Sequence, residues 1–213
     1  MSGPPNQRLQ AAHLYAITPD AEPERLTELA QAVVRGGVDV LQLRHKTLAR
    51  GHLLDLARSL RELTAEAGVL FIVNDHLDIA MLAGADGVHL GDDDLSPAEA
   101  RRLAPPGFII GASAGTPDAA RAAVTAGADY LGCGPAFATP VKAGKAVIGS
   151  EGVLGVMAAV EVPVFAIGGI DPANVDQLVA RGIDRVCMIR GLSDAGDPEA
   201  ATREVKSKLV SWL

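Results

Sequence analysis

Amide and acidic side chains follow two apolar segments of the sequence, at the point where each segment ends. Asn74 and Asp75 come directly after the segment 69–73, and the aspartate run 92–94 comes just after the segment 86–90. Carboxylates that lie close together repel one another, and more strongly so in less polar surroundings. Mg²⁺ relieves such repulsion, because it binds one or two carboxylates and fills its other positions with water and phosphate oxygens. We therefore predict a Mg²⁺ site that uses one aspartate from each acidic segment.

Each acidic segment also has a simpler interpretation. The carboxylate of Asp75 could cap the helix that the following residues predict. The run 92–94 could be a solvated loop with no ligand. The cation site requires both segments to lie at one place, and the fold must supply that proximity.

Polar side chains also end an earlier apolar segment, 39–44. Gln42, Arg44 and Lys46 alternate along this segment and just beyond it, so they share one side of a strand. Glutamine forms hydrogen bonds, whereas arginine binds phosphate oxygens as a fork and lysine binds them as a point charge. The alternative is a solvated strand end, but three polar side chains on one side of a buried strand favour a binding site. His45 has the opposite parity and is expected to point away.

Four further segments carry groups that suit phosphate ligands. A serine ends the segment 108–113, and the glycine- and proline-rich loop 134–147 carries a threonine and two lysines. Long loops of this kind often act as lids. A Gly-Gly pair and an Arg-Gly pair end two later apolar segments, where bare backbone amides can approach an anion. The groups are Ser113, Thr139, Lys142, Lys145, Gly168, Gly169, Arg190 and Gly191.

No pair of nucleophile and base stands out among these residues. His89 lies inside an apolar segment and is interpreted as a core histidine. The chemistry that remains is the handling of phosphorylated ligands with Mg²⁺. A pyrophosphate leaving group suits it, because charge neutralisation and positioning can then carry the catalysis.

The elements that must position these groups are short apolar strands that alternate with amphipathic helices. Several helical patterns begin with Asp, Ser or Thr followed by Pro, and most end at Gly, which are the usual boundary signals. The count of eight strands favours a barrel over a doubly wound sheet, which usually has five or six. The predicted strands are 13–18, 39–44, 69–73, 86–90, 108–113, 129–134, 162–167 and 185–189.

A weak internal repeat supports the same architecture. Asp39, Asp86, Asp129 and Asp184 each follow a helix-ending glycine and precede an apolar strand, at intervals of 43 to 55 residues. That spacing matches two strand–helix units for each repeat. We predict an α/β fold with a single (β/α)₈ TIM barrel over residues 13–213, preceded by an N-terminal tail, 1–12. In such barrels the site lies at the C-terminal ends of the strands, so the polar strand ends described above should meet there.

Composition excludes several other classes of protein. The chain has 213 residues, a net charge of −7 and 48% hydrophobic residues, which fits a globular domain without the basic surface of a nucleic-acid binder. No apolar run is long enough for a membrane span, and no leader sequence is apparent, so a cytoplasmic protein without membrane partners is expected. Cys133 and Cys187 lie in apolar segments and are expected to be buried thiols. Composition does not decide whether the chain forms a homo-oligomer.

Five motifs, in order along the chain, resemble the thiamine phosphate synthase family: VLQLRHK, VNDHLDIAMLAGADGVHLGDDDL, IIGAS, GADYLGCGPAFATPVK and VPVFAIGGI. The resemblance covers about residues 13–200. It implies a (β/α)₈ transferase of thiamine biosynthesis that joins 4-amino-2-methyl-5-pyrimidinylmethyl diphosphate to thiazole phosphate and releases pyrophosphate with Mg²⁺. It also implies a dissociative mechanism, in which a pyrimidine-stabilised cation forms and the thiazole nitrogen captures it.

The resemblance assigns roles to twelve residues. Asp75 and Asp94 become the Mg²⁺ ligands. Arg44, Lys46, Ser113 and Lys142 become the catalytic residues around the diphosphate. The pyrimidine diphosphate is expected on Gln42, Arg44, Lys46, Asn74, Ser113 and Lys142, and the thiazole phosphate on Thr139, Gly169, Ile189 and Arg190.

The chain departs from the family pattern at a few positions. Val141 and Arg190 stand where the family usually has a hydroxyl residue, and both fall on the thiazole-phosphate side. Asp92 replaces a frequent Gln, and Ala114-Gly115 replaces a frequent Thr-His. A thiazole tautomerase of the same superfamily is the first alternative, although its histidine after strand five is missing here. A non-catalytic protein that binds a phosphorylated ligand is the second alternative, and a sugar-phosphate isomerase, which needs an acid–base pair, is the third.

Overall fold

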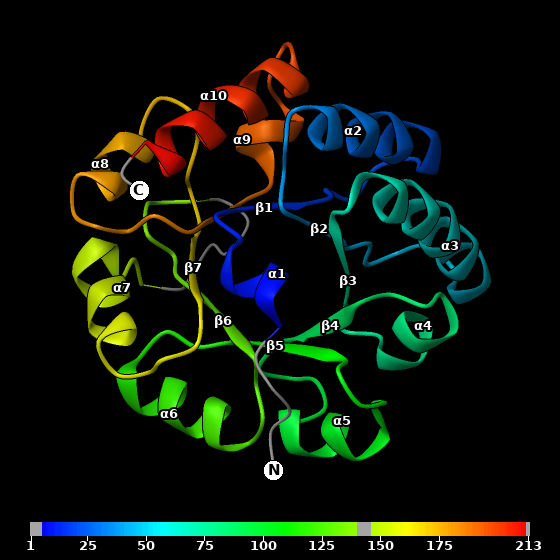
Figure 1. The fold of residues 1–213 in the computed structure, drawn as a ribbon, viewed down its shortest axis with the longest axis horizontal. Coiled ribbons are helices and arrows are strands. Elements are labelled where there is room, and N and C mark those ends of the chain that lie inside the picture. Colours follow the sequence, from blue (N-terminus) through cyan, green and yellow to red (C-terminus); the bar gives the residue numbers. More distant parts are fainter. Residues whose placement is uncertain (1–5, 140–145, 212–213) are drawn as a thin grey trace.

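The computed structural model describes residues 6–139 and 146–211 and forms a closed barrel of eight parallel strands in the order β1 to β8 (Figure 1). β1 closes the ring against β8, where Leu14 pairs with Val186. The prediction of a single (β/α)₈ barrel is confirmed, and every strand falls within a residue or two of its predicted segment. The strands are β1 Leu14–Ile17, β2 Val40–Leu43, β3 Leu70–Asn74, β4 Gly87–Leu90, β5 Ile109–Ser113, β6 Tyr130–Cys133, β7 Val164–Ile167 and β8 Val186–Met188.

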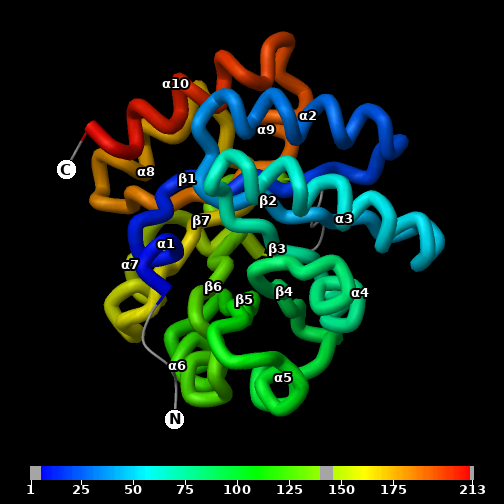
Figure 2. Tube along the Cα trace, turned by 45° about the vertical axis from the view of Figure 1, so that its right-hand side comes forward, coloured from blue at the N-terminus to red at the C-terminus, as the bar shows by residue number. Residues whose placement is uncertain are grey.

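All the helices except α1 surround the barrel on its outer face (Figures 1 and 2). Within the described residues none of them is long and apolar enough to cross a membrane. The helices are α1 Gln7–Gln10, α2 Pro23–Arg35, α3 Arg50–Ala67, α4 Leu77–Leu82, α5 Pro97–Leu103, α6 Pro117–Thr125, α7 Gly149–Met157, α8 Val175–Val179, α9 Arg190–Ser193 and α10 Pro198–Val210.

The core has two parts. The larger part lies between the strands and the outer helices, and a smaller cluster fills the barrel interior with Tyr15, Tyr130 and Phe165 among its members. Leu9 of α1 is 1% exposed and belongs to the interior cluster. Helix α1, which lies within the segment expected to be an N-terminal tail, therefore covers the N-terminal end of the barrel. Cys133 and Cys187 are both buried thiols, as predicted.

The repeated aspartates have a physical role at this N-terminal end. Asp39, Asp86 and Asp129 each precede an even-numbered strand and accept hydrogen bonds from backbone N–H groups at the start of the preceding odd-numbered strand. Each carboxylate also pairs with a basic side chain from an outer helix. The backbone donors are Leu14 (2.9 Å), Phe71 (2.8 Å) and Ile110 (2.7 Å), and the basic partners are Lys206, Arg61 and Arg101 respectively.

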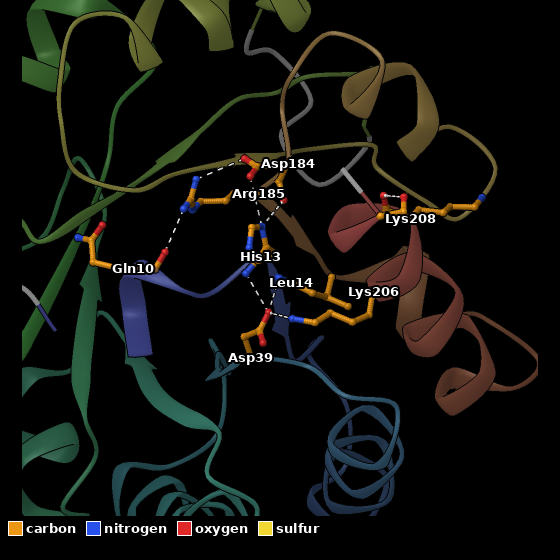
Figure 3. A network of polar contacts seen from close by, with 9 residues as sticks. Gln10, His13, Leu14, Asp39, Asp184, Arg185, Lys206 and Lys208 are labelled. Carbon is orange, nitrogen blue, oxygen red and sulfur yellow. Dashed lines mark hydrogen bonds and ion pairs between the residues drawn. The ribbon is translucent and has the colours of Figure 1, made fainter. Parts of the chain in front are cut away.

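The fourth aspartate of the repeat uses different partners. Asp184 lies 3.4 Å from the His13 ring and 3.3 Å from the Arg185 guanidinium (Figure 3). Arg185 in turn donates to the Gln10 carbonyl at 3.0 Å. This network ties α1 to the start of β8. The N-terminal rim is therefore held by charged pairs, which leaves the opposite rim available for chemistry.

Candidate active site

A cavity of about 670 Å³ lies at the C-terminal end of the barrel, a volume typical of small-molecule sites. Its walls come from the strand ends and the loops that follow them, as the barrel geometry predicts. The structure brings eight of the predicted site residues together around this one cavity. They are Gln42, Arg44, Lys46, Asn74, Asp75, Asp94, Ser113 and Ile189.

One wall carries the basic residues that follow β2. The Arg44 guanidinium donates to a carboxylate oxygen of Asp20 at 2.9 Å, and the backbone N–H of Lys46 donates to the other oxygen at 2.7 Å. Burial alone would raise the pKa of Asp20, but these hydrogen bonds and the Arg44 charge lower it. Asp20 therefore stays ionised and positions both basic residues. It lies just past the end of β1, and the sequence patterns did not point to this residue.

The neighbouring wall carries the acidic segment after β3, the strand that pairs with β2. Asp75 has a φ of +61°, a left-handed conformation that is uncommon for residues other than glycine. The N–H of His76 donates to the Asn74 carbonyl at 2.7 Å, which closes a tight turn around Asp75. The side chain of Asp75 lines the cavity and does not cap α4, whose N-terminus has no side-chain cap. The capping interpretation of Asp75 is therefore wrong.

Asp94 from the loop after β4 meets Asp75 across the cavity mouth. One oxygen of Asp94 accepts the Gly91 N–H at 2.7 Å, which fixes the direction of its carboxylate. Burial, a hydrogen bond with Asp94 and the negative charge of Asp94 raise the pKa of Asp75 to about 6. Two facing carboxylates that repel each other when both are ionised fit a divalent cation. Lys46 also lies near Asp75, and its positive charge favours the ionised carboxylate. Among the described residues no cluster of three or more acidic, His or Cys ligands exists, so a cation here would use the pair together with ligand oxygens.

The floor of the cavity contains a residue whose interpretation the structure corrects. His89 is half-buried and lines the cavity, so its interpretation as a core histidine is wrong. Its ring contacts the Tyr130 hydroxyl at 3.1 Å and the Ser113 hydroxyl at 3.2 Å. The reason is the strand parity: His89 points inward where the barrel opens. His45, as expected, points away and contacts the Ala21 carbonyl at 3.0 Å.

A second cavity of about 380 Å³ adjoins the first and is lined by three of the four remaining predicted residues, Thr139, Gly169 and Arg190. Ile167, Cys187 and Ile189 line both cavities. Gly168 and Gly169 have φ values of +98° and +67°, and a Cβ at Gly169 would lie 2.6 Å from the Ala138 carbonyl. Asn174, which sequence reasoning missed, donates to the Gly169 carbonyl at 2.8 Å and holds this turn. The backbone of this turn and Arg190 offer groups that suit a phosphate, and Asp171 and Asp194 also line the cavity.

Lys142, together with Val141 and Lys145, lies outside the described residues. Ala114 and Gly115 line a third cavity of about 250 Å³ beside Ser113, and they bring no imidazole there.

The family model and the sequence relatives agree on one family. A family model described as thiamine monophosphate synthase matches residues 14–192. The thiamine-phosphate synthase of Methanoculleus marisnigri is 46% identical over 202 residues, which cover 93% of this chain and 95% of that relative. The thiamine-phosphate synthase of Moorella thermoacetica is 46% identical over 180 residues, which cover 84% and 86%. A solved structure of thiamine phosphate pyrophosphorylase from Pyrococcus furiosus is similar with a TM-score of 0.87 and 35% identity, and the match covers 98% of this chain and 100% of that one.

Proposed function

The chain belongs to the thiamine monophosphate synthase family and is a transferase, and we propose that it couples 4-amino-2-methyl-5-pyrimidinylmethyl diphosphate to thiazole phosphate with Mg²⁺. One observation carries this proposal: two cavities with different chemistry share a wall. The larger cavity combines basic side chains with a carboxylate pair, and the smaller one is a glycine cup with Arg190. A diphosphate donor and a monophosphate acceptor would therefore lie side by side.

The larger cavity is suited to holding a diphosphate. Arg44 and Lys46 would bind its oxygens, and Ser113 would donate a hydrogen bond from the β5 side. Asp20 keeps the Arg44 guanidinium in place before the ligand arrives, so less entropy is lost on binding. Asp75 and Asp94 would hold Mg²⁺, and the ion, when bound, neutralises charge that develops on the leaving pyrophosphate.

The reaction is a substitution at the methylene carbon of the pyrimidine. The carbon–oxygen bond breaks, and pyrophosphate leaves with the electron pair. The pyrimidine ring stabilises the cation that results, and the thiazole nitrogen donates its lone pair to form the new carbon–nitrogen bond. No proton transfer is needed for this balance. Gln42 and Asn74 would orient the pyrimidine, and the glycine cup would orient the thiazole phosphate.

The direct test mixes the purified chain with both substrates and Mg²⁺ and measures thiamine phosphate and pyrophosphate. We expect equimolar products, and loss of turnover when the metal is removed by a chelator and restored by added Mg²⁺. Absence of product, while thiazole phosphate still binds by calorimetry, would favour the non-catalytic alternative. Turnover unaffected by the chelator would refute the Mg²⁺ requirement while leaving the coupling reaction in place.

A further inference from the structure

The floor of the larger cavity contains a chain of hydrogen bonds that the proposed function leaves without a role. The Gln42 amide nitrogen donates to the Tyr15 hydroxyl at 2.7 Å, and the Tyr15 and Tyr130 hydroxyls lie 2.8 Å apart. Tyr130 lies 3.1 Å from Nδ1 of His89, whose Nε2 lies 3.2 Å from the Ser113 hydroxyl. This hydrogen-bond chain crosses the barrel from Gln42 of β2 to Ser113 of β5.

The surrounding structure is shaped to hold this chain. Tyr15 and Tyr130 are the two tyrosines of the sequence, and each is 1% exposed. Both rings pack edge-on against Phe165, with centroid distances of 5.4 and 5.8 Å. A Cβ at Gly111 would collide with the Tyr130 ring, so glycine at this place in β5 admits the ring. Burial raises the pKa of both tyrosines far above their ordinary value, so each hydroxyl is neutral and carries one proton.

The donor at one end fixes the direction of every proton. The amide nitrogen of Gln42 is a donor only, so the Tyr15 hydroxyl oxygen accepts a hydrogen bond from it. Tyr15 must therefore donate its own proton to the Tyr130 hydroxyl oxygen. Tyr130 then gives its proton to Nδ1 of His89. The reverse order would leave the Tyr15 proton facing the Gln42 N–H, and a buried hydroxyl without an acceptor is costly. The imidazole is therefore neutral with its proton on Nε2, which donates to Ser113.

Ser113 is the last member of this hydrogen-bond chain and lines the cavity that would hold the ligand. Since its oxygen accepts from Nε2 of His89, its own proton is left to point into the cavity. We propose that Tyr15, Tyr130 and His89 are positioning residues that hold Ser113 as a hydrogen-bond donor toward an anionic ligand oxygen. A donor whose direction is set in advance needs no reorganisation when the ligand charge develops. This inference rests on the proposed function for the identity of that ligand, the pyrimidine diphosphate.

The first test reads the proton positions directly and needs no turnover. In ¹⁵N-labelled protein at pH 7.5, the five histidines give separate ring signals, and a His89→Gln variant identifies those of His89. We expect an unprotonated Nδ1 and a protonated Nε2 in the wild type. In Tyr130→Phe, which removes only the hydroxyl, the share of the Nε2–H form should fall, because Nδ1 loses its donor and can then carry the proton. A proton on Nδ1 in the wild type, with Nε2 bare or protonated, would overturn the proposal.

The second test measures whether Tyr130 acts through Ser113. Tyr130→Phe should lower kcat/KM for the pyrimidine diphosphate by about tenfold, the effect of one buried hydrogen bond. In a Ser113→Ala background the same change should cost less than about twofold, because the group being positioned is gone. Leu70→Ala is the packing control, because Leu70 belongs to the same interior cluster but does not line the cavity: its loss should be equal in both backgrounds, and the His89 signals should stay unchanged. Equal losses for Tyr130→Phe in both backgrounds would contradict the proposal.

The two proposals fail in different ways. If the wild type makes no thiamine phosphate, the proposed coupling reaction is wrong. The energetic dependence of Tyr130 on Ser113 is then measured from the Kd for pyrimidine diphosphate, by calorimetry on the same single and double variants. Dependence of the Tyr130 effect on Ser113 would still support the positioning chain, and independence would still refute it.

Discussion

Two carboxylates from different loops, Asp75 and Asp94, face each other at the mouth of the barrel, and each is fixed by its own backbone turn. Asp75 adopts a left-handed φ of +61°, and Asp94 accepts the N–H of Gly91. Neither turn would be needed for a solvated loop. At the scale of the single residue, this mutual arrangement separates the pair from the exposed aspartates beside it, Asp92 and Asp93.

Removal of either carboxylate should abolish Mg²⁺-dependent turnover and leave the fold intact. We expect Asp75→Asn and Asp94→Asn each to lower kcat by at least about a hundredfold, the range seen when a preorganised charge-stabilising group is lost. Asp93→Asn is the comparator, since it removes the same charge from the same loop, and it should lose no more than a few-fold. Turnover and circular dichroism check the three variants. Full activity of Asp75→Asn or Asp94→Asn would remove that residue from the metal site.

The raised pKa of Asp75 also predicts how the metal-free protein responds to pH. Its ordinary pKa is about 3.9 in the unfolded chain, whereas it is about 6 in the folded protein. Between these values the folded state holds a proton that the unfolded state has lost, so stability falls as the pH rises from about 4 to 6. For this half-buried group, solvent screening reduces the expected loss to about 1 kcal/mol.

Thermal denaturation with a chelator, from pH 4 to 7, measures this effect as the difference between the wild type and Asp75→Asn. The wild type should lose stability relative to the variant as the pH rises. Mg²⁺ should restore stability to the wild type at pH 7 and not to the variant, because binding requires the ionised pair. A difference between the two proteins that does not change with pH would contradict the assigned pKa.

At the scale of the element, the turn after β7 forms the cup of the smaller cavity. Gly168 and Gly169 both have positive φ, and the Phe137 N–H donates to the Gly168 carbonyl at 2.9 Å. This contact ties the turn to the loop after β6. The cup therefore depends on two connecting segments rather than on one motif.

Gly169→Ala should impair acceptor binding more than its backbone strain alone explains. The new Cβ would lie 2.6 Å from the Ala138 carbonyl, next to Thr139 in the cup. Gly182→Ala is the matched control, because its φ of +79° imposes a similar strain while no atom lies within 4 Å of the new Cβ. We expect both variants to lose about 1 kcal/mol of stability from strain. Only Gly169→Ala should raise KM for thiazole phosphate, by about tenfold or more, the effect of about 1.4 kcal/mol in binding.

An equal KM in the two glycine variants would place the acceptor phosphate elsewhere. Steady-state kinetics with saturating pyrimidine diphosphate make this comparison, and urea denaturation checks the strain of each variant separately.

At the scale of the whole molecule, the two ends of the barrel divide stability and function. The N-terminal rim carries the repeated aspartates with their partners, of which Figure 3 shows Asp39 with Lys206. Helix α1 covers the barrel interior at this rim. The C-terminal rim carries the cavities and the facing carboxylates. Substitutions at the first rim should therefore change stability without changing the reaction.

Asp86→Ala tests this division. The carboxylate accepts the Phe71 N–H at 2.8 Å and pairs with Arg61 at 3.3 Å, so its loss leaves a backbone donor and a cation without their partner. We expect the free energy of unfolding to fall by about 2 kcal/mol. Asp118→Ala, whose side chain is 92% exposed on α6, should change it by less than about 0.5 kcal/mol. Urea denaturation measures both, and kcat and KM should match the wild type; a large fall in kcat for Asp86→Ala would show that the rims are coupled.

The sequence by itself determined the barrel and the rim at which chemistry takes place. Strand and helix periodicity, glycine at helix ends and the aspartate repeat are local signals, and they predicted the strands to within a residue or two. Because the C-terminal ends of parallel strands must meet, the polar residues at those ends were found without a structure. Asp75, Asp94 and Gln42 belong to this group.

Only the tertiary structure decided which of those side chains meet, and through which partners. Tyr15 and Tyr130 are 115 residues apart and touch across the barrel interior. Asp20 holds Arg44 from a separate loop, and His89 reaches Ser113 from the neighbouring strand. No local pattern encodes these contacts, because they arise from the closure of the barrel. A sequence period tells which side of a strand a residue faces, whereas the strand order and register decide what it faces.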